Sequence, residues 1–221
     1  MKIAVLGTGK TGGKVIDEAE ARGHEVFAFN SKKQPTSHEL KELDVIICFL
    51  NGKVLETYIN EIIASGIPAV IGATGSDWKA GLDEKLKEAG LTWIYAPNFA
   101  ATMPKIKKIV EILSEIEADA QPHLEETHHV DKVDSPSGTA LAWEEWLGKK
   151  VTFTDYREAD TFGIHKLTIE TENETVSIEH TAKDRSAFAL GAVRAAENLC
   201  NTQTEPGLES LYDIGGENEE D

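Results

Sequence analysis

Short apolar runs alternate with longer amphipathic stretches over the first hundred residues of the chain. The apolar runs predict strands at Lys2–Leu6, Glu25–Asn30, Asp44–Phe49, Ala69–Gly72 and Thr92–Tyr95. Apolar residues spaced three and four positions apart predict helices at Gly12–Arg22, Lys53–Ser65 and Asp77–Ala89. This alternation is typical of an α/β fold, a Rossmann-type doubly wound parallel sheet.

The pattern changes after Pro97. A helix comes first, and a strand follows at about His123–Thr127. Further along is a hairpin, in which His165–Thr171 pairs with Thr175–Thr181. The hairpin alternates apolar and polar residues, which indicates a sheet with one covered face. We therefore expect a second, α+β domain that carries a mixed or antiparallel sheet.

A long helix is predicted from about Ser186 to Cys200, and an acidic segment follows at 215–221. We expect the long helix to return to the first domain. The expected domains are accordingly residues 1–100 with 190–221, and residues 101–189.

A glycine-rich turn joins the first predicted strand to the first predicted helix. It has the pattern G-x-G-x-x-G and consists of Gly7, Thr8, Gly9, Lys10, Thr11 and Gly12. Between a strand and a helix, these glycines permit a tight turn, close approach of a pyrophosphate and close packing of helix on strand. The turn therefore predicts a dinucleotide cofactor, NADPH or NADH, bound to the first domain.

The end of the second strand bears on which nucleotide binds. NAD-specific sites usually carry an acidic residue there for the ribose 2′-hydroxyl, but this chain has Asn30 followed by Ser31, Lys32 and Lys33. Because ammonium groups suit a 2′-phosphate, we expect NADPH to bind at least as well as NADH.

Two further loops follow predicted strands, so they are expected at the carboxyl edge of the sheet, beside the nicotinamide. These loops contain Gly72, Ala73 and Thr74, and Ala96, Pro97, Asn98 and Phe99.

The most chemically dense segment of the chain is Glu126–Ala140. Pro136 disfavours a helix at the residue before it, so Ser137 can provide the N-cap hydroxyl of a following helix. The amides of Gly138 and Thr139 then open the helix, where N–H groups and the helix dipole favour a carboxylate or phosphate.

The same segment supplies groups that exchange protons. His128 titrates near neutral pH, and the ammonium of Lys132 stabilises negative charge or donates a proton. The segment therefore predicts an anion-binding site with an acid/base function.

Composition narrows the possible partners and the location. The chain has 221 residues and a net charge of −17, which argues against nucleic acid or an anionic membrane as the main partner. It has no apolar run long enough to cross a membrane and no signal-peptide pattern at its start, so we expect a cytoplasmic location. Cys48 and Cys200 have neither a disulfide pattern nor metal-ligand spacing.

The segment from Glu126 to Ala140 also resembles a known family. It matches E-x-H-x-x-x-K-x-D-x-P-S-G-T-A, the signature of the 4-hydroxy-tetrahydrodipicolinate reductase (dihydrodipicolinate reductase) family, at every fixed position. Supporting matches extend over roughly residues 1–214. They include the glycine turn, Ile71–Gly75, Ala96–Phe99, the helix from Arg185 to Ala192, and Gly207 with Leu211, Tyr212 and Asp213.

The resemblance implies NAD(P)H-dependent reduction of a small cyclic dicarboxylate, 4-hydroxy-tetrahydrodipicolinate, in lysine and diaminopimelate biosynthesis. It implies that His128 is the catalytic acid/base, that Lys132 is the catalytic lysine and that His129 contacts substrate. The family's substrate-binding pair falls on Gly138 and Thr139, next to Ser137. The resemblance also implies that the first domain binds the dinucleotide, and that the second binds substrate and forms a homotetramer.

Three alternatives remain at this point. A paralogous reductase of another small anionic imine or carbonyl would lack parts of the signature, and a nucleotide-sensing regulator would bind cofactor without turnover. A metal site of His123, His128, His129 and Asp131 is awkward, because adjacent residues of an extended strand point to opposite faces. We therefore expect no metal ligand among the site residues.

Overall fold

The computed structural model describes residues 1–117 and 121–214, which form two compact units. One unit contains residues 1–101 together with the chain from residue 185 onward, and the other contains residues 102–184.

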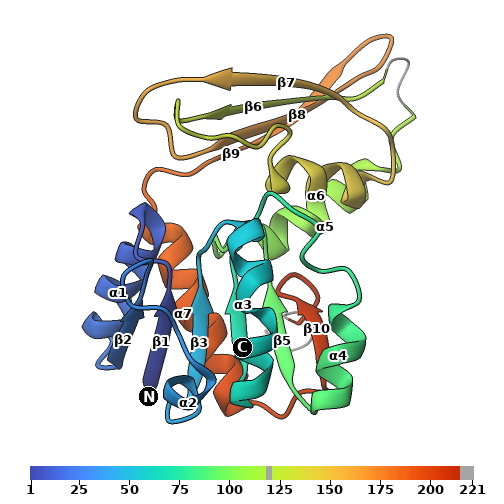
Figure 1. Cartoon of the computed structure of the whole chain (residues 1–221). Coiled ribbons are helices and arrows are strands. Elements are labelled where there is room, and N and C mark those ends of the chain that lie inside the picture. The colour runs from blue at the N-terminus through green and yellow to red at the C-terminus, as the bar shows by residue number, and fades with distance from the viewer. Residues whose placement is uncertain (118–120, 215–221) are drawn as a thin grey trace. The chain divides into compact units, whose positions relative to one another are not determined.

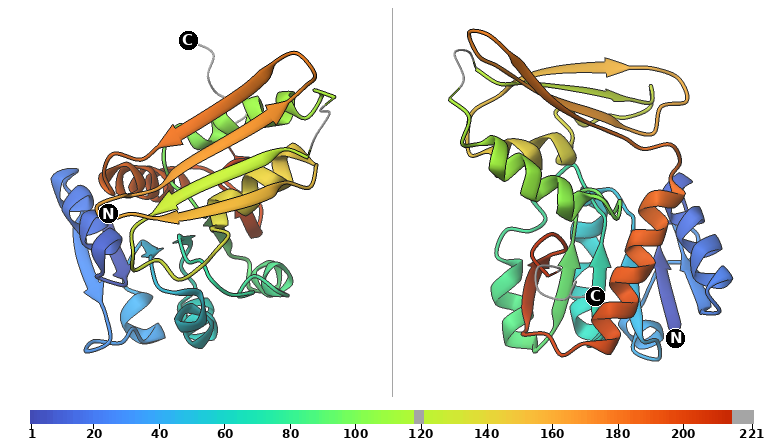
Figure 2. Two further views of the ribbon diagram at one scale, coloured as in Figure 1. Left: turned by 90° about the horizontal axis from the view of Figure 1, so that it is seen from above. Right: turned by 180° about the vertical axis from the view of Figure 1, so that it is seen from behind.

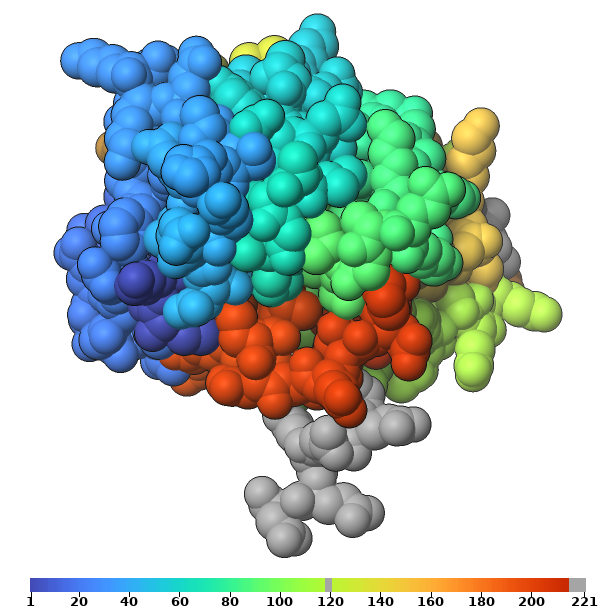
Figure 3. Space-filling model, turned by 60° about the horizontal axis from the view of Figure 1, so that its bottom comes forward, coloured from blue at the N-terminus to red at the C-terminus, as the bar shows by residue number. Residues whose placement is uncertain are grey.

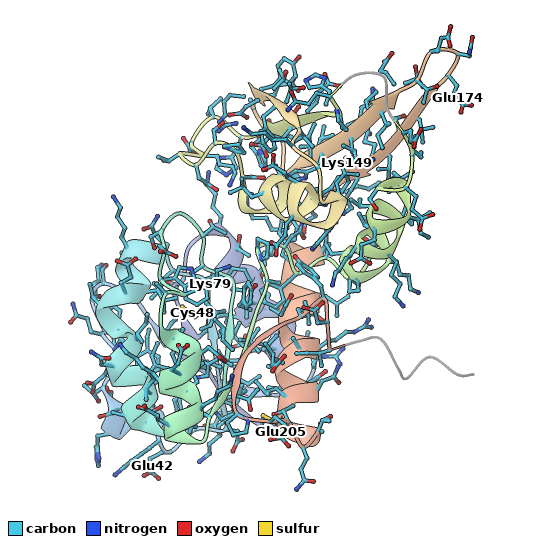
Figure 4. The ribbon with its side chains drawn as sticks, turned by 90° about the vertical axis from the view of Figure 1, so that its right-hand side faces the viewer. Glu42, Cys48, Lys79, Lys149, Glu174 and Glu205 are labelled. Carbon is cyan, nitrogen blue, oxygen red and sulfur yellow. The ribbon has the colours of Figure 1, made fainter. Side chains whose placement is uncertain are left out.

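The first unit is built on a parallel six-stranded sheet with the order β10-β5-β4-β3-β1-β2. Its strands are β1 (Lys2–Leu6), β2 (Glu25–Phe29), β3 (Val45–Cys48), β4 (Ala69–Ile71), β5 (Thr92–Tyr95) and β10 (Gly207–Ser210). The central strands are fully buried and nearly continuously apolar, as expected for a parallel sheet with both faces covered. The Cys48 thiol lies inside this core, where burial raises its pKa to about 12 (Figure 4).

Helices cover both faces of this sheet (Figure 1). They are α1 (Lys10–Ala21), α2 (Ser37–Leu40), α3 (Gly52–Ser65), α4 (Leu82–Ala89) and α7 (Ser186–Asn201). Helices α1 and α7 pack against each other on one face, and α3 and α4 lie on the other. Helix α7 thus belongs to the first unit, and Figure 3 shows this late segment alongside the first hundred residues.

The second unit is a mixed four-stranded sheet with the order β7-β6-β8-β9. Its strands are β6 (His123–His128), β7 (Thr152–Arg157), β8 (Ile164–Glu170) and β9 (Thr175–Thr181). Strand β6 is parallel to β7 and antiparallel to β8, and β8 and β9 form the predicted hairpin, with Glu174 at its tip (Figure 4). Helices α5 (Met103–Leu113) and α6 (Gly138–Leu147) lie on one face of the sheet, which confirms a sheet with one covered face (Figure 2).

Some predicted boundaries were wrong. Helix α1 begins at Lys10, two residues before its predicted start, and β2 ends at Phe29. Helix α4 begins at Leu82 instead of Asp77, because its N-cap Gly81 has a left-handed conformation (φ 65°) that interrupts the helical pattern.

Three short elements were not predicted, namely α2, β7 and β10. The predicted acidic segment at 215–221 lies outside the described residues. Among the helices that the structure describes, none is long and apolar enough to cross a membrane.

Candidate active site

Helix α6 starts where the sequence predicts. Its N-cap is Ser137, whose buried hydroxyl accepts a hydrogen bond from the Ala140 N–H at 3.1 Å, and Gly138 is the first helical residue. Within residues 1–117 and 121–214, the Gly138 N–H has no hydrogen-bond acceptor. The helix therefore presents a donor and the positive end of its dipole at this position.

A carboxylate on β6 fixes this helix start to the sheet. Oε1 of Glu126 accepts a hydrogen bond from the Ser137 N–H at 2.8 Å. The Glu126 side chain is only 1% exposed, and burial raises its pKa above the usual range of a glutamate. Sequence reasoning gave no role to Glu126 beyond its match to the signature.

Two histidines accompany Glu126 on the covered face of the sheet. His128 lies two residues further along β6, and His165 is the direct cross-strand partner of Glu126 on β8. The two imidazole centroids are 5.1 Å apart, and Nε2 of His165 is 3.1 Å from Oγ of Ser137. Sequence reasoning missed His165, although it shares a face with the apolar Leu167 and Ile169 of its strand.

Both imidazoles are neutral at pH 7 in this structure. Burial, with added repulsion from Lys132 and Arg157, lowers the pKa of His128 to about 4. Burial is also the main cause that places the pKa of His165 well below its usual value. The expectation that His128 titrates near neutral pH is therefore wrong for this structure, in which its imidazole is a weaker base than that of an ordinary histidine.

The predicted catalytic lysine is held by a carboxylate. Lys132 is part of the turn that follows β6. Its Nζ donates hydrogen bonds to both carboxylate oxygens of Asp134, each at 2.8 Å. Arg157 on β7 ties this turn to the sheet by donating hydrogen bonds to the carbonyl oxygens of Lys132 and Asp134, both at 3.2 Å. Arg157 is itself paired with Asp155.

His129 lies in the same turn. It follows the last residue of β6 and is half-buried, and its carbonyl oxygen accepts a hydrogen bond from the Lys132 N–H at 3.1 Å. The second unit therefore gathers the predicted catalytic and substrate-binding residues on one strand, one turn and one helix start. These residues are His128, His129, Lys132, Ser137, Gly138 and Thr139.

The glycine turn of the first unit has the geometry that its pattern predicts. Gly7 has φ 94°, and a Cβ on Gly12 would lie 1.7 Å from the Gly7 carbonyl oxygen. A Cβ on Gly9, the N-cap of α1, would meet no atom within 4 Å. Gly7 and Gly12 are thus required by the turn and by helix packing, and Gly9 leaves open space beside the helix start.

The loop after β2 is closed by its own asparagine. Oδ1 of Asn30 accepts hydrogen bonds from the backbone N–H groups of Lys32 at 2.9 Å and Lys33 at 3.2 Å. Nζ of Lys33 lies 4.7 Å from the centroid of the Phe29 ring. Ser31 and Lys32 are exposed, and in the described parts of the chain the Lys32 ammonium has no ion-pair partner.

The loops after β3, β4 and β5 converge at the carboxyl edge of the sheet. The ring centroids of Phe49 and Phe99 are 5.8 Å apart. A Cβ on Gly72 would lie 2.5 Å from the nearest atom of the Phe49 ring. The hydroxyl of Tyr212 donates a hydrogen bond to the Asn98 carbonyl oxygen at 2.7 Å. The structure thus brings together the four predicted loops, which contain Gly7–Gly12, Asn30–Lys32, Gly72–Thr74 and Ala96–Phe99.

Comparison with known proteins agrees with this arrangement. The family model described as "Dihydrodipicolinate reductase, C-terminus" matches residues 102–214, and a model described as "CoA binding domain" matches residues 1–99. A 4-hydroxy-tetrahydrodipicolinate reductase of Christiangramia forsetii is 32% identical over 97% of this chain and 97% of its own length. The enzyme of the same name from Natronomonas pharaonis is 30% identical, over 91% of this chain and 95% of its own.

Solved structures show the same fold. The dipicolinate-bound dihydrodipicolinate reductase of Paenisporosarcina sp. TG-14 superposes with a TM-score of 0.72 at 17% identity, covering 97% of this chain and 99% of that one. An amine dehydrogenase of Mycobacterium smegmatis gives a TM-score of 0.67 at 11% identity, over 94% of each chain.

The nucleotide-binding fold and the named relatives define a reductase that uses NAD(P)H. Within that class, the chain belongs to the 4-hydroxy-tetrahydrodipicolinate reductase (dihydrodipicolinate reductase) family. The resemblance stated from the signature is thereby confirmed.

Proposed function

We propose that the chain reduces 4-hydroxy-tetrahydrodipicolinate to tetrahydrodipicolinate with NADPH or NADH, in lysine and diaminopimelate biosynthesis. One observation carries this proposal. His128, Lys132 and the start of α6 lie close together in one small region of the second unit. The fixed residues of the family signature are therefore also spatial neighbours.

The start of α6 suits one carboxylate of a cyclic dicarboxylate. A helix N-terminus favours an anion, and the Gly138 N–H is available to donate a hydrogen bond. We assign substrate binding to Ser137, Gly138 and Thr139, and to His129 in the neighbouring turn. The Ser137 hydroxyl is already used to cap the helix. Ser137 therefore contributes to substrate binding through its backbone, which sets where the helix starts.

The proton chemistry falls to Lys132 and His128. The reaction needs loss of water from the substrate and then addition of a hydride, which the reduced nicotinamide supplies when bound, together with a proton. The Lys132 ammonium, held by Asp134, stabilises the negative charge that develops on the ring and can donate this proton. The neutral imidazole of His128 exchanges protons with the substrate.

The first unit is assigned to the nucleotide. The open space beside Gly9 suits the pyrophosphate, and the start of α1 adds backbone N–H groups. The exposed Lys32 suits a ribose 2′-phosphate, which supports binding of NADPH at least as well as NADH. The nicotinamide is assigned to the loops at Gly72–Thr74 and Ala96–Phe99.

We further assign substrate binding and assembly into a homotetramer to residues 101–189, and nucleotide binding to residues 1–100 with 190–221. The face of the second sheet opposite α5 and α6 is the proposed assembly surface, and the proposed location is the cytoplasm. Light scattering coupled to size exclusion would measure the mass, and a monomer would contradict the assembly.

The decisive experiment is a turnover assay. Substrate is generated in situ from aspartate semialdehyde and pyruvate by the preceding synthase, and oxidation of NADPH or NADH is followed by absorbance. Lys132→Ala should lower kcat by about 100-fold or more, the usual contribution of an acid/base group. Lys150→Ala, an exposed lysine after α6, is the matched control and should retain activity.

Two results would favour the alternatives. Nucleotide binding with turnover only of another imine or carbonyl would indicate a paralogous reductase. Nucleotide binding with no turnover of any such substrate would indicate a sensor.

A further inference from the structure

Three metal-ligating side chains meet on the covered face of the second sheet. Glu126 and His128 are two residues apart on β6, so they share a face, and His165 is directly opposite Glu126 on β8. One ligand atom from each residue can be chosen so that all three lie within 4.8 Å of one another. All three side chains are buried.

Two of the donor atoms lack a hydrogen bond. Oε2 of Glu126 and Nδ1 of His128 are buried, and neither has a hydrogen-bond partner in the portion of the chain that the structure describes. Such atoms are rare in protein interiors and need an explanation. A bound ion would satisfy both.

The spacing of the donors fits a small ion. Oε2 of Glu126 is 3.6 Å from Nε2 of His165 and 3.9 Å from Nδ1 of His128. A tetrahedral ion about 2.1 Å from each donor places the donors roughly 3.4 Å apart. Both separations from the carboxylate are close to that distance. A donor atom of one imidazole lies within 4.8 Å of one on the other, so the two rings draw closer together when an ion binds.

The surroundings favour one class of ion. Two imidazoles and one carboxylate suit Zn²⁺ and its neighbours among the transition metals, whereas Mg²⁺ and Ca²⁺ prefer oxygen ligands. The nearby cations Lys132 and Arg157 are already paired with Asp134 and Asp155, which reduces their repulsion of an ion. The strand register holds the three ligands in place independently of any ion.

We propose that Glu126, His128 and His165 bind one divalent transition-metal ion of the Zn²⁺ class, with water as the fourth ligand, and that the ion inhibits the enzyme. Binding depends only on these three residues. Inhibition rests on the proposed function, because the ion would occupy the imidazole of His128 that exchanges protons with substrate.

The test measures metal binding directly on the full chain, without cofactor or substrate. After chelator treatment and its removal, Zn²⁺ is titrated by calorimetry, and Co²⁺ by the visible absorption of a tetrahedral site. One equivalent should bind per chain, and Glu126→Gln and His165→Gln should each weaken binding at least tenfold. His123→Gln is the matched control, because His123 contacts Thr154 and lies on the opposite face of β6.

No stoichiometric binding, or equal binding by the wild type and by Glu126→Gln and His165→Gln, would overturn the proposal. If these variants do not fold, two-bond ¹H–¹⁵N spectra of the wild type decide. Zn²⁺ must then shift the ring nitrogens of His128 and His165 and leave those of His123 unchanged, and any other pattern contradicts the site.

The turnover assay separates this proposal from the proposed function. Zn²⁺ should inhibit the wild type, and a chelator should restore the rate. A chain that binds Zn²⁺ at these residues without any turnover contradicts the proposed reaction alone, whereas turnover without Zn²⁺ binding contradicts the metal site alone.

Discussion

The Ser137 N–H donates a hydrogen bond to Oε1 of Glu126 at 2.8 Å, and this contact joins the start of α6 to the middle of β6. The two residues are eleven positions apart, and the turn that carries Lys132 lies between them. The hydrogen bond uses the backbone of Ser137, so the hydroxyl of Ser137 can be removed without breaking it.

Ser137→Ala is expected to lower the free energy of unfolding by about 1 kcal/mol, the usual value of an N-cap. The variant loses the hydrogen bond that the Ser137 hydroxyl accepts from the Ala140 N–H, and its contact with His165. It keeps the hydrogen bond from the Ser137 backbone N–H to the Glu126 carboxylate. Urea denaturation followed by circular dichroism measures the change. Glu145→Ala, at an exposed position of the same helix, should change stability by less than about 0.5 kcal/mol. Equal effects of the two substitutions would contradict a capping role.

Gly12→Ala and Gly13→Ala should have opposite effects, although the two glycines are adjacent in α1. A Cβ on Gly12 would lie 1.7 Å from the Gly7 carbonyl oxygen, whereas one on Gly13 would meet no atom within 4 Å. We expect Gly12→Ala to cost about 3 kcal/mol through overpacking, and Gly13→Ala to stabilise by up to about 1 kcal/mol through helix propensity. Thermal unfolding measures both, and destabilisation of equal size would contradict the packing argument.

The parallel sheet was predictable because its strands are continuous apolar runs such as Val45–Cys48. Strand β7 was not predictable, because it is half-buried and Phe153 is its only strongly apolar residue. Strand β10 has the sequence Gly-Leu-Glu-Ser, and only its pairing with β5 makes it a strand. Short edge strands carry little periodicity, so tertiary pairing determines them.

The candidate site was predictable only where its residues are close in sequence. The N-cap Ser137 and the turn with Lys132 follow from local rules for helix starts and prolines. The position of His165 beside Glu126 depends on the register between β6 and β8, which no local pattern specifies. The partner of Lys132 is Asp134, two residues away, and the side-chain conformation determines this pairing.

Lys32→Ala should alter the choice of nucleotide without altering the reaction. Since the Lys32 ammonium is exposed and suits a 2′-phosphate, its loss should raise the KM for NADPH by about tenfold, the value of a charge-assisted hydrogen bond. The KM for NADH and both kcat values should stay unchanged. Lys33→Ala is the comparison, because Lys33 already contacts the Phe29 ring. Equal increases in KM for both nucleotides would contradict recognition of the phosphate by Lys32.

The stability of the first unit should depend on pH through an ion pair between α1 and α7. Glu197 accepts hydrogen bonds from Arg22 at 2.9 and 2.7 Å and lies 2.8 Å from Nε2 of His24. The Arg22 hydrogen bonds are the largest cause that lowers the pKa of Glu197 below its usual value. A carboxyl group with a lowered folded-state pKa stabilises the fold above its unfolded pKa of about 4.3, and this contribution is lost as pH falls through the folded-state pKa.

Glu197→Gln should therefore lower the midpoint of thermal unfolding at pH 7, and the difference from the wild type should shrink as the pH falls from 5 towards 3. The expected loss at pH 7 is up to about 1 kcal/mol, because the pair is partly exposed to solvent. Differential scanning calorimetry at several pH values measures the difference. Glu88→Gln, at an exposed position of α4, is the control and should show no such pH dependence. A Glu197→Gln difference that persists unchanged at pH 3 would show that the charge of Glu197 is not what links the two helices.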